Sequence, residues 1–288
     1  MKREGFTLIE LTLVLFILAL AAHLGSRSLL GAKSAARRKV ADRQLDEIAA
    51  AVYCEKGGEP SGFLADMGRL PFAKSVPGDS LCLSELYARP EGIGDFRARP
   101  ASAENLADAA PAAIADSSVL VPCGWGGPYV QLPQGASRLR DPWGNPMENG
   151  GDAAAARLLD ASFAAVCVTN VPVAAIRHFG SDGMPDAERP PASPEAQDAT
   201  RHFDFAPAGL LLDFLPDTVS RVVWYAPLGD RITGGEAFTA AGASQLLLEG
   251  IAPGVRIVKI HFSDGTSRVL SVPLRAGRDE IFAVERQP

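Results

Sequence analysis

The chain has 288 residues, of which 47% are hydrophobic, and it carries a formal net charge of −6. This length is enough for a membrane helix and one or two globular domains, each with its own core. The excess of acidic residues argues against nucleic acid as the main partner, so we expect no nucleic-acid binding.

The N-terminal segment joins a basic tip to an apolar run. Lys2 and Arg3 come first, and residues 6–22 are then apolar or threonine apart from one carboxylate, Glu10. A helix of this length crosses most of a hydrocarbon layer. A carboxylate at that depth is costly, which makes Glu10 a candidate functional residue that needs a partner. A cut after Gly5 would create such a partner, the new α-amino group at position 6.

Two simpler interpretations of this segment stay open. A secretory signal peptide would be cut after its apolar region, where Ala19, Ala21 and Ala22 provide small residues. An ordinary membrane anchor would need no cut, but it would leave the carboxylate of Glu10 unexplained.

Residues 5–11, GFTLIEL, resemble the processing site of the type IV pilin and type II secretion pseudopilin superfamily. The resemblance implies that a prepilin peptidase cuts between Gly5 and Phe6, and that the new N-terminal Phe6 is methylated. It also implies that Glu10 contacts the N-terminal amine of the neighbouring subunit during assembly. The basic tip would hold the N-terminus in the cytoplasm by the positive-inside bias, with the rest of the chain in the periplasm.

A helical pattern continues beyond the apolar run. Ala41, Leu45, Ile48 and Val52 recur at helical spacing, and no proline interrupts residues 25–53. This pattern predicts one continuous helix at residues 6–53. Together with the resemblance, which implies a leader peptide at residues 1–5, it makes this helix the expected transmembrane and assembly helix.

Four cysteines occur, and none forms a C-x-x-C pair, so a zinc site is not expected. An even number in an oxidising compartment favours disulfides. Of the three possible connectivities, Cys54–Cys82 with Cys123–Cys167 closes local loops and is preferred, with free buried thiols as the alternative.

Two blocks in the middle of the chain, GWGGPYV at residues 124–130 and DPWGNP at residues 141–146, resemble the head domain of the major pseudopilin of type II secretion. That family places them before a small antiparallel sheet. As an alternative, the second block is simply a tight turn, since its Asp, Pro, Gly and Asn residues favour turns in any protein.

The loop GSDGMPD at residues 180–186 is similar to the calcium loop of the same family. The resemblance implies that Asp182 and Asp186 ligate Ca²⁺, with Ser181 as a weaker candidate, since Ca²⁺ prefers several oxygen ligands. An acidic surface turn is the alternative. No other cofactor is expected.

The C-terminal part differs in character. A proline-rich linker is expected at residues 191–217, after a head at residues 54–190. Short apolar or alternating segments separated by turns then predict a small β-sandwich at residues 218–288. It would bind a partner or stabilise the head.

The resulting fold prediction is α+β: a long membrane-spanning helix packed on a small antiparallel head sheet, as in pilins, with an added C-terminal β-sandwich-like domain. No nucleophile, phosphate-loop or dinucleotide motif occurs, so we expect no enzymatic activity.

The predicted function is a pseudopilin-like structural subunit of a type II secretion system. It would be inserted once in the inner membrane and built into a periplasmic pseudopilus that exports proteins across the outer membrane. Its expected partners are further copies or other pseudopilins, the prepilin peptidase and methyltransferase, and the inner-membrane secretion platform. The alternatives are a minor pilin of a type IV pilus, serving adhesion or DNA uptake, and a membrane-anchored periplasmic binding protein that does not assemble.

Overall fold

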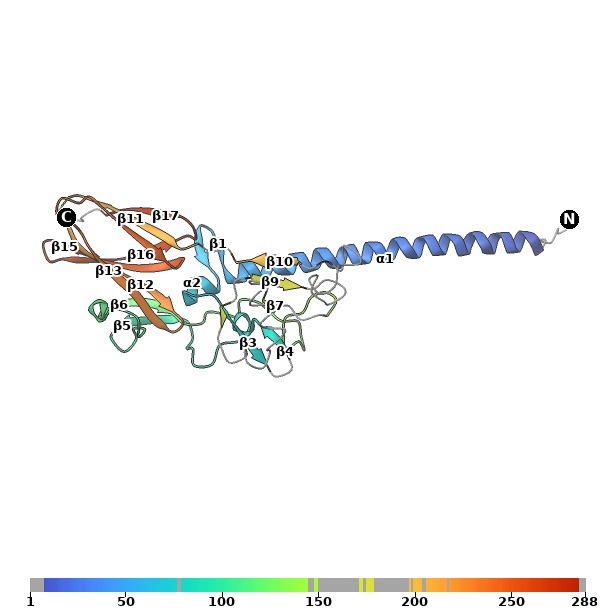
Figure 1. Ribbon diagram of the computed structural model, residues 1–288, viewed down its shortest axis with the longest axis horizontal. Coiled ribbons are helices and arrows are strands. Elements are labelled where there is room, and N and C mark those ends of the chain that lie inside the picture. The colour runs from blue at the N-terminus through green and yellow to red at the C-terminus, as the bar shows by residue number, and fades with distance from the viewer. Residues whose placement is uncertain are drawn as a thin grey trace. The chain divides into compact units, whose positions relative to one another are not determined.

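The computed structural model describes residues 8–76, 79–144, 148–149, 171–172, 175–178, 197, 199–203, 206–216 and 218–284. Strands dominate it (Figure 1). The helical elements are α1 (Leu8–Val52), α2 (Phe63–Met67) and the 3₁₀ turns η1 (Ser84–Leu86) and η2 (Ala112–Ile114). The strands are β1 (Cys54–Lys56), β2 (Glu59–Ser61), β3 (Phe72–Val76), β4 (Asp79–Cys82), β5 (Arg97–Ala101), β6 (Asp116–Cys123), β7 (Glu148–Asn149), β8 (Val171–Pro172), β9 (Ala175–His178), β10 (Ala199–His202), β11 (Ala208–Phe214), β12 (Val219–Leu228), β13 (Arg231–Phe238), β14 (Gln245–Ile251), β15 (Gly254–Phe262), β16 (Ser267–Leu274) and β17 (Asp279–Val284).

The contacts divide the chain into two compact units. Unit 1 contains Met1–Gln44, Arg140–Asn145 and His178–Ala199, and unit 2 contains Leu45–Leu139, Pro146–Arg177 and Thr200–Pro288. The helix α1 therefore contributes to both units.

The last two turns of α1 belong to unit 2 and are amphipathic. Leu45, Ile48 and Val52 are buried there, at the spacing that places them on one face of the helix. The helix ends at Val52, where the backbone N–H of Tyr53 donates to the carbonyl of Ala49 at 3.0 Å. The β1–β2 hairpin then begins.

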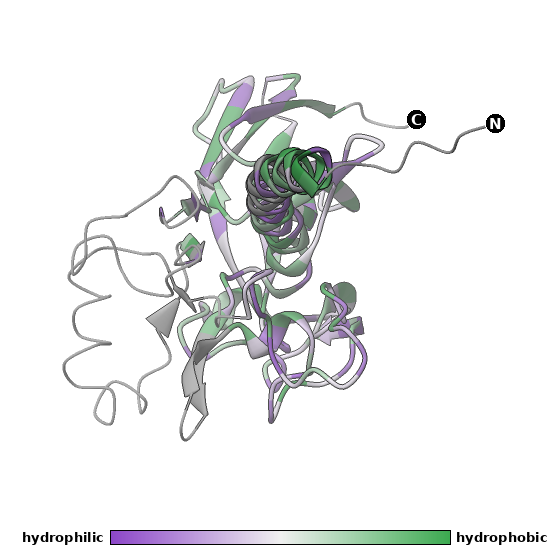
Figure 2. Ribbon diagram, turned by 90° about the vertical axis from the view of Figure 1, so that its right-hand side faces the viewer, coloured by the Kyte–Doolittle hydropathy of each residue, from purple (hydrophilic) through white to green (hydrophobic). Residues whose placement is uncertain are grey.

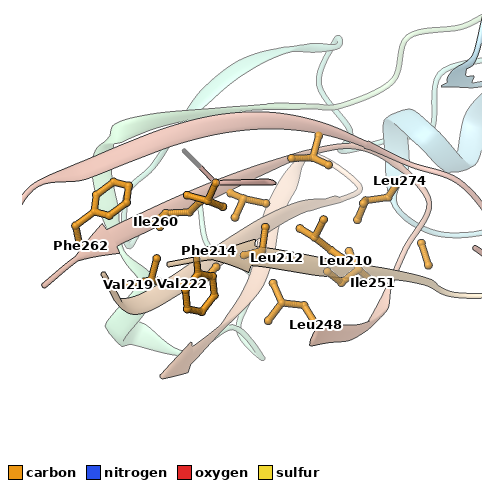
Figure 3. Close-up of a cluster of buried hydrophobic side chains, with 14 residues drawn as sticks. Leu210, Leu212, Phe214, Val219, Val222, Leu248, Ile251, Ile260, Phe262 and Leu274 are labelled. Carbon is orange, nitrogen blue, oxygen red and sulfur yellow. The ribbon is translucent and has the colours of Figure 1, made fainter. Parts of the chain in front are cut away.

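The main core of unit 2 lies between two sheets, one with strand order β14-β11-β17 and the other with order β13-β12-β15-β16. Along β11, Leu210, Leu212 and Phe214 are buried whereas Asp213 is exposed, which is the alternation of a half-buried strand. Figure 3 shows these side chains among apolar residues of β12, β14, β15 and β16. Since β17 pairs with β11 in parallel, the end of the chain closes this sheet beside a strand about 70 residues earlier.

A second core connects β6 with the other face of the four-stranded sheet. Ile114, Val121, Tyr225 and Ile232 are fully or almost fully buried in it. The hydroxyl of Tyr225 donates to the carbonyl of Ile114 at 3.0 Å, so the polar end of this buried ring is satisfied.

The fold predicted from the sequence is wrong. In the part of the chain that the structure describes, the strands form six small sheets rather than one antiparallel head sheet, and the core lies between sheets. The C-terminal strands share a compact unit with residues 45–139 instead of forming a separate domain. β11 also lies inside residues 191–217, the segment expected to be a linker.

The N-terminal helix departs from the expectation as well. Its apolar part is short and ends at Ala22, after which His23, Gly25, Ser26 and Arg27 interrupt the apolar residues. Within the described ranges, the helices lack the combination of length and apolarity needed to cross a membrane.

The ion pair between Asp116 of β6 and Lys259 of β15 predicts a pH dependence. The hydrogen bond from Lys259, with a second from Ser118, lowers the pKa of Asp116 to about 2. Because the folded-state pKa lies below the unfolded value, the pair stabilises the protein above about pH 4 and loses this effect as the pH falls towards 2. We expect Asp116→Asn to lower the Tm by about 1–3 °C at pH 7 and by nothing measurable near pH 2.

Thermal unfolding of both proteins across this pH range measures the difference directly. Asp279→Asn, which changes an exposed carboxylate, serves as the control. An Asp116→Asn deficit that stays constant down to pH 2 would show that the ion pair is not its source.

Candidate functional site

The structure describes only one of the three N-terminal residues predicted to act in processing and assembly. Gly5 and Phe6 lie outside the described residues, whereas Glu10 lies in the first turn of α1 and is exposed. The predicted calcium ligands Ser181, Asp182 and Asp186 also lie outside them. Among the described residues, no group of histidine, cysteine and acidic side chains is arranged to hold a metal ion.

Of the four cysteines expected to form disulfides, the structure describes the side chains of Cys54 and Cys123, and both are free thiols. The side chain of Cys82 and the whole of Cys167 lie outside the described residues. Cys123 is fully buried, and burial raises the pKa of its thiol to about 11. A thiol with that pKa stays protonated at neutral pH and is a poor nucleophile.

The first turns of α1 expose apolar side chains on every side. We call residues 8–22 the apolar segment. Its large side chains are between 48% and 82% exposed, namely Leu8, Ile9, Leu11, Leu13, Val14, Leu15, Phe16, Ile17, Leu18 and Leu20. Four consecutive residues of a helix point in four directions, so Leu15–Leu18 alone surround the axis. Figure 2, which looks along α1 from its N-terminal end, shows this segment as hydrophobic.

A helix that is apolar all round is normally buried in protein or lipid. Each buried square ångström of such surface contributes about 25 cal/mol. The apolar segment therefore has a strong tendency to become covered, by lipid or by other apolar helices. This is the clearest functional feature of α1.

A second candidate site lies in unit 2, where the block at residues 124–130 packs on α2 and η1. The indole N–H of Trp125 donates to the carbonyl of Glu85 at 2.8 Å, and its ring meets that of Tyr129 edge-on at 6.0 Å. The ring of Tyr129 also contacts that of Phe63 at 5.5 Å. Trp125 and Tyr129 thus hold α2 and η1 together.

Glycines allow this close packing. A Cβ on Gly126 would lie 2.4 Å from a carboxylate oxygen of Asp66, and one on Gly127 would lie 2.6 Å from the Trp125 ring. A side chain at either position would have to displace Asp66 or the Trp125 ring, which gives the Gly-Gly pair a physical reason.

A carboxylate, a tyrosine and a backbone amide form a polar chain at this point. The Tyr129 hydroxyl donates to Oδ2 of Asp66 at 2.9 Å and accepts from the N–H of Gly126 at 2.9 Å. Burial raises the pKa of Asp66, partly offset by the Tyr129 hydrogen bond and the charge of Arg256. The pKa of Tyr129 is raised too, mainly by burial, so its hydroxyl remains protonated.

These groups border a cavity of about 250 Å³, which we call the α1 cavity because it lies against the last turn of that helix. Its lining is Ala50, Ala51, Cys54, Lys56, Ser61, Gly62, Asp66, Gly126, Pro128 and Tyr129. The lining combines the carboxylate of Asp66 and the hydroxyls of Ser61 and Tyr129 with apolar groups, an arrangement suited to binding a small polar ligand.

The first residues of the DPWGNP block, 141–144, belong to unit 1 and form a turn. Oδ1 of Asp141 accepts from the N–H of Trp143 at 3.0 Å, and its carbonyl accepts from the N–H of Gly144 at 3.0 Å. Gly144 has a φ of 97°, which glycine adopts without strain. The Trp143 ring lies 5.8 Å from the ring of His178, which is fully buried.

The sequence pattern around Asp66 and Tyr129 predicted no function for either side chain. A carboxylate within the short apolar segment 63–67 was the available signal. Its hydrogen-bond partner Tyr129 is more than 60 residues away, so the spacing of residues could not reveal the contact.

Neither a protein-family model nor a curated protein matches this chain.

Proposed function

We propose that this chain is a pseudopilin-like subunit of a type II secretion system, anchored in the inner membrane and assembled into a periplasmic fibre. The apolar segment of α1, exposed on all sides, is the observation that supports the proposal most directly. The resemblance of residues 5–11 to a prepilin processing site supports it independently. The fold of unit 2 contributes nothing to the proposal.

In the proposed mechanism, the exposed apolar surface of α1 is buried first by lipid and later by other subunits. The anchor, residues 6–22, begins before the first described residue and is covered by lipid until assembly. Helices of neighbouring subunits replace the lipid in the fibre. Packing, rather than a hydrophobic difference, then has to select the register, because lipid and leucine are equally apolar.

Glu10 would select that register by charge. It lies within the apolar segment, and removal of residues 1–5 would give the neighbouring subunit a positive N-terminal amine. Two opposite charges meeting in a low-dielectric layer attract strongly, whereas a misplaced carboxylate is penalised. The favoured register is therefore the one in which the Glu10 carboxylate meets the N-terminal amine of the neighbouring subunit.

We expect Glu10→Ala to reduce incorporation into the fibre at least thirtyfold while membrane insertion is unchanged. Truncating one partner of a desolvated charge pair costs about 2 kcal/mol or more, and 2 kcal/mol corresponds to this factor. Quantitative immunoblots of sheared fibre and of membranes, from cells that express the variant, measure both quantities.

Glu47→Ala is the matched control, because Glu47 is an exposed carboxylate of the same helix outside the apolar segment. It should assemble normally. Normal incorporation of Glu10→Ala would contradict the assembly role.

The α1 cavity supports a second candidate function, a membrane-anchored binding protein that does not assemble. In that case the Glu10→Ala protein would keep its activity, since the cavity lies in unit 2. The same immunoblots separate the two, because a non-assembling protein is absent from the sheared fraction even without substitution.

A further inference from the structure

The α1 cavity lies at the negative end of a long helix. The last carbonyl groups of a helix lack intrahelical partners, and the aligned peptide dipoles give this end about half a negative charge. Ala50 and Ala51 of the last turn line the cavity, and the last turn of α1 contains no basic residue. Gly62 lies close to this end, since a Cβ there would be 2.9 Å from the carbonyl oxygens of Ala51 and Val52. The helix end thus favours a cation that its own sequence does not provide.

Asp66 adds a full negative charge to the lining of the cavity, and one of its two carboxylate oxygens is available to a ligand. Its Oδ2 accepts from Tyr129, whereas Oδ1 receives no hydrogen bond from any described residue. Arg256 is the nearest buried cation, but its guanidinium donates to the carbonyls of Ala252, Pro253, Val255 and Ala65. Arg256 therefore reduces the field at Asp66 without occupying Oδ1.

We propose that the α1 cavity binds a primary ammonium group, as carried by a small alkylamine or a lysine side chain of a partner peptide. An ammonium group has three donors and no acceptor, which matches Oδ1 of Asp66, the Ser61 hydroxyl and the carbonyls of the helix end. The methyl and methylene groups of Ala50, Ala51 and Pro128 provide an apolar wall for the attached carbons.

The size and charge of the cavity limit the kinds of ligand that it can bind. Small-molecule sites commonly occupy about 300–1,000 Å³, so a cavity of about 250 Å³ accepts one small group. A divalent metal ion would need six or more oxygens and more than one carboxylate. An anion would face both Asp66 and the negative helix end. Lys56 borders the cavity with an exposed side chain, so its charge weakens the binding of a cation without blocking the cavity.

The test is an NMR titration of the full-length protein in detergent micelles, following the amide signals of Gly62 and Gly126. Propylammonium chloride should shift these signals saturably, while sodium propionate, 1-propanol and potassium chloride should not at the same concentrations. Asp66→Asn should weaken propylammonium binding at least tenfold, since it removes the charge and keeps an oxygen for the Tyr129 hydroxyl.

Lys56→Gln should tighten the binding two- to fivefold, because it removes the competing cation at the rim. Glu59→Gln, an exposed carboxylate that does not line the cavity, should leave it unchanged. The inference fails if propylammonium gives no saturable shift, if propionate or potassium shifts these amides equally, or if Lys56→Gln weakens propylammonium binding. None of these outcomes depends on fibre assembly, so the proposed function is tested separately.

Discussion

Glu85→Ala is expected to lower the free energy of unfolding by about 3–5 kcal/mol, the usual cost of removing one partner from a buried ion pair. The Glu85 side chain is 3% exposed. Its carboxylate accepts two hydrogen bonds from Arg69, at 2.8 and 3.2 Å, and one from the N–H of Phe72 at 2.8 Å.

The loss is large because three donors lose their acceptor together. The Arg69 guanidinium lies over the rings of Phe72 and Phe63, at 4.1 and 5.4 Å from their centroids. These rings stabilise the cation weakly and cannot replace a carboxylate. Without Glu85, Arg69 would have to leave this position or remain there with an unbalanced charge.

Urea unfolding of the purified full chain measures this cost. Glu91→Ala, an exposed carboxylate in a nearby loop, should change stability by less than about 0.5 kcal/mol. The double variant Arg69→Met/Glu85→Leu should be more stable than Glu85→Ala, because it removes both charges and keeps the volume. A loss below about 1 kcal/mol for Glu85→Ala would contradict the role assigned to this pair.

Arg256→Met is expected to lower the free energy of unfolding by about 2–4 kcal/mol, because several carbonyls lose their donor together at about 1–3 kcal/mol for each one left buried and unsatisfied. Arg256 is 1% exposed and is the largest fully buried side chain among the described residues. Its Nη1 donates to the carbonyl of Ala65 in α2 at 3.0 Å, and its Nε donates to the carbonyl of Ala252 at 2.7 Å. The guanidinium therefore connects α2 to the turn between β14 and β15.

Methionine fits the volume of the arginine stem but leaves these carbonyls without donors. Arg256→Lys should recover only part of the loss, since a single ammonium cannot reach carbonyls arranged around a planar fork. Arg278→Met, at an exposed arginine, is the control and should be nearly neutral. If Arg256→Met and the unchanged protein are equally stable in urea, the hydrogen bonds from Arg256 to these carbonyls do not stabilise the fold.

The strands near the C-terminus were the part of the fold most open to prediction. The pattern of apolar residues predicts a strand at residues 255–262 and another at residues 267–273, and the bounds of β15 and β16 differ from these by one residue each. Local patterns of this kind are set by which face of a strand is buried. The pairing of β17 with β11 is not local, and it places Leu210 and Leu212 in a core that no short window reveals.

The same limit applies to the candidate sites. Glu10 was visible because a carboxylate inside an apolar run is unusual in any window of sequence. Asp66, Glu85 and Arg256 are ordinary charged residues until the fold places them beside Tyr129, Arg69 and the carbonyl of Ala65. Their roles depend on contacts across many residues, so spacing alone could not assign them.

The mass of the N-terminal peptide, measured on the protein purified from its own membranes, tests the central proposal most directly. The proposal predicts a chain that starts at Phe6 with one methyl group on its α-amino nitrogen. A chain that retains residues 1–5, or one that starts beyond residue 20, would contradict it, because Glu10 would then have no new amine to meet.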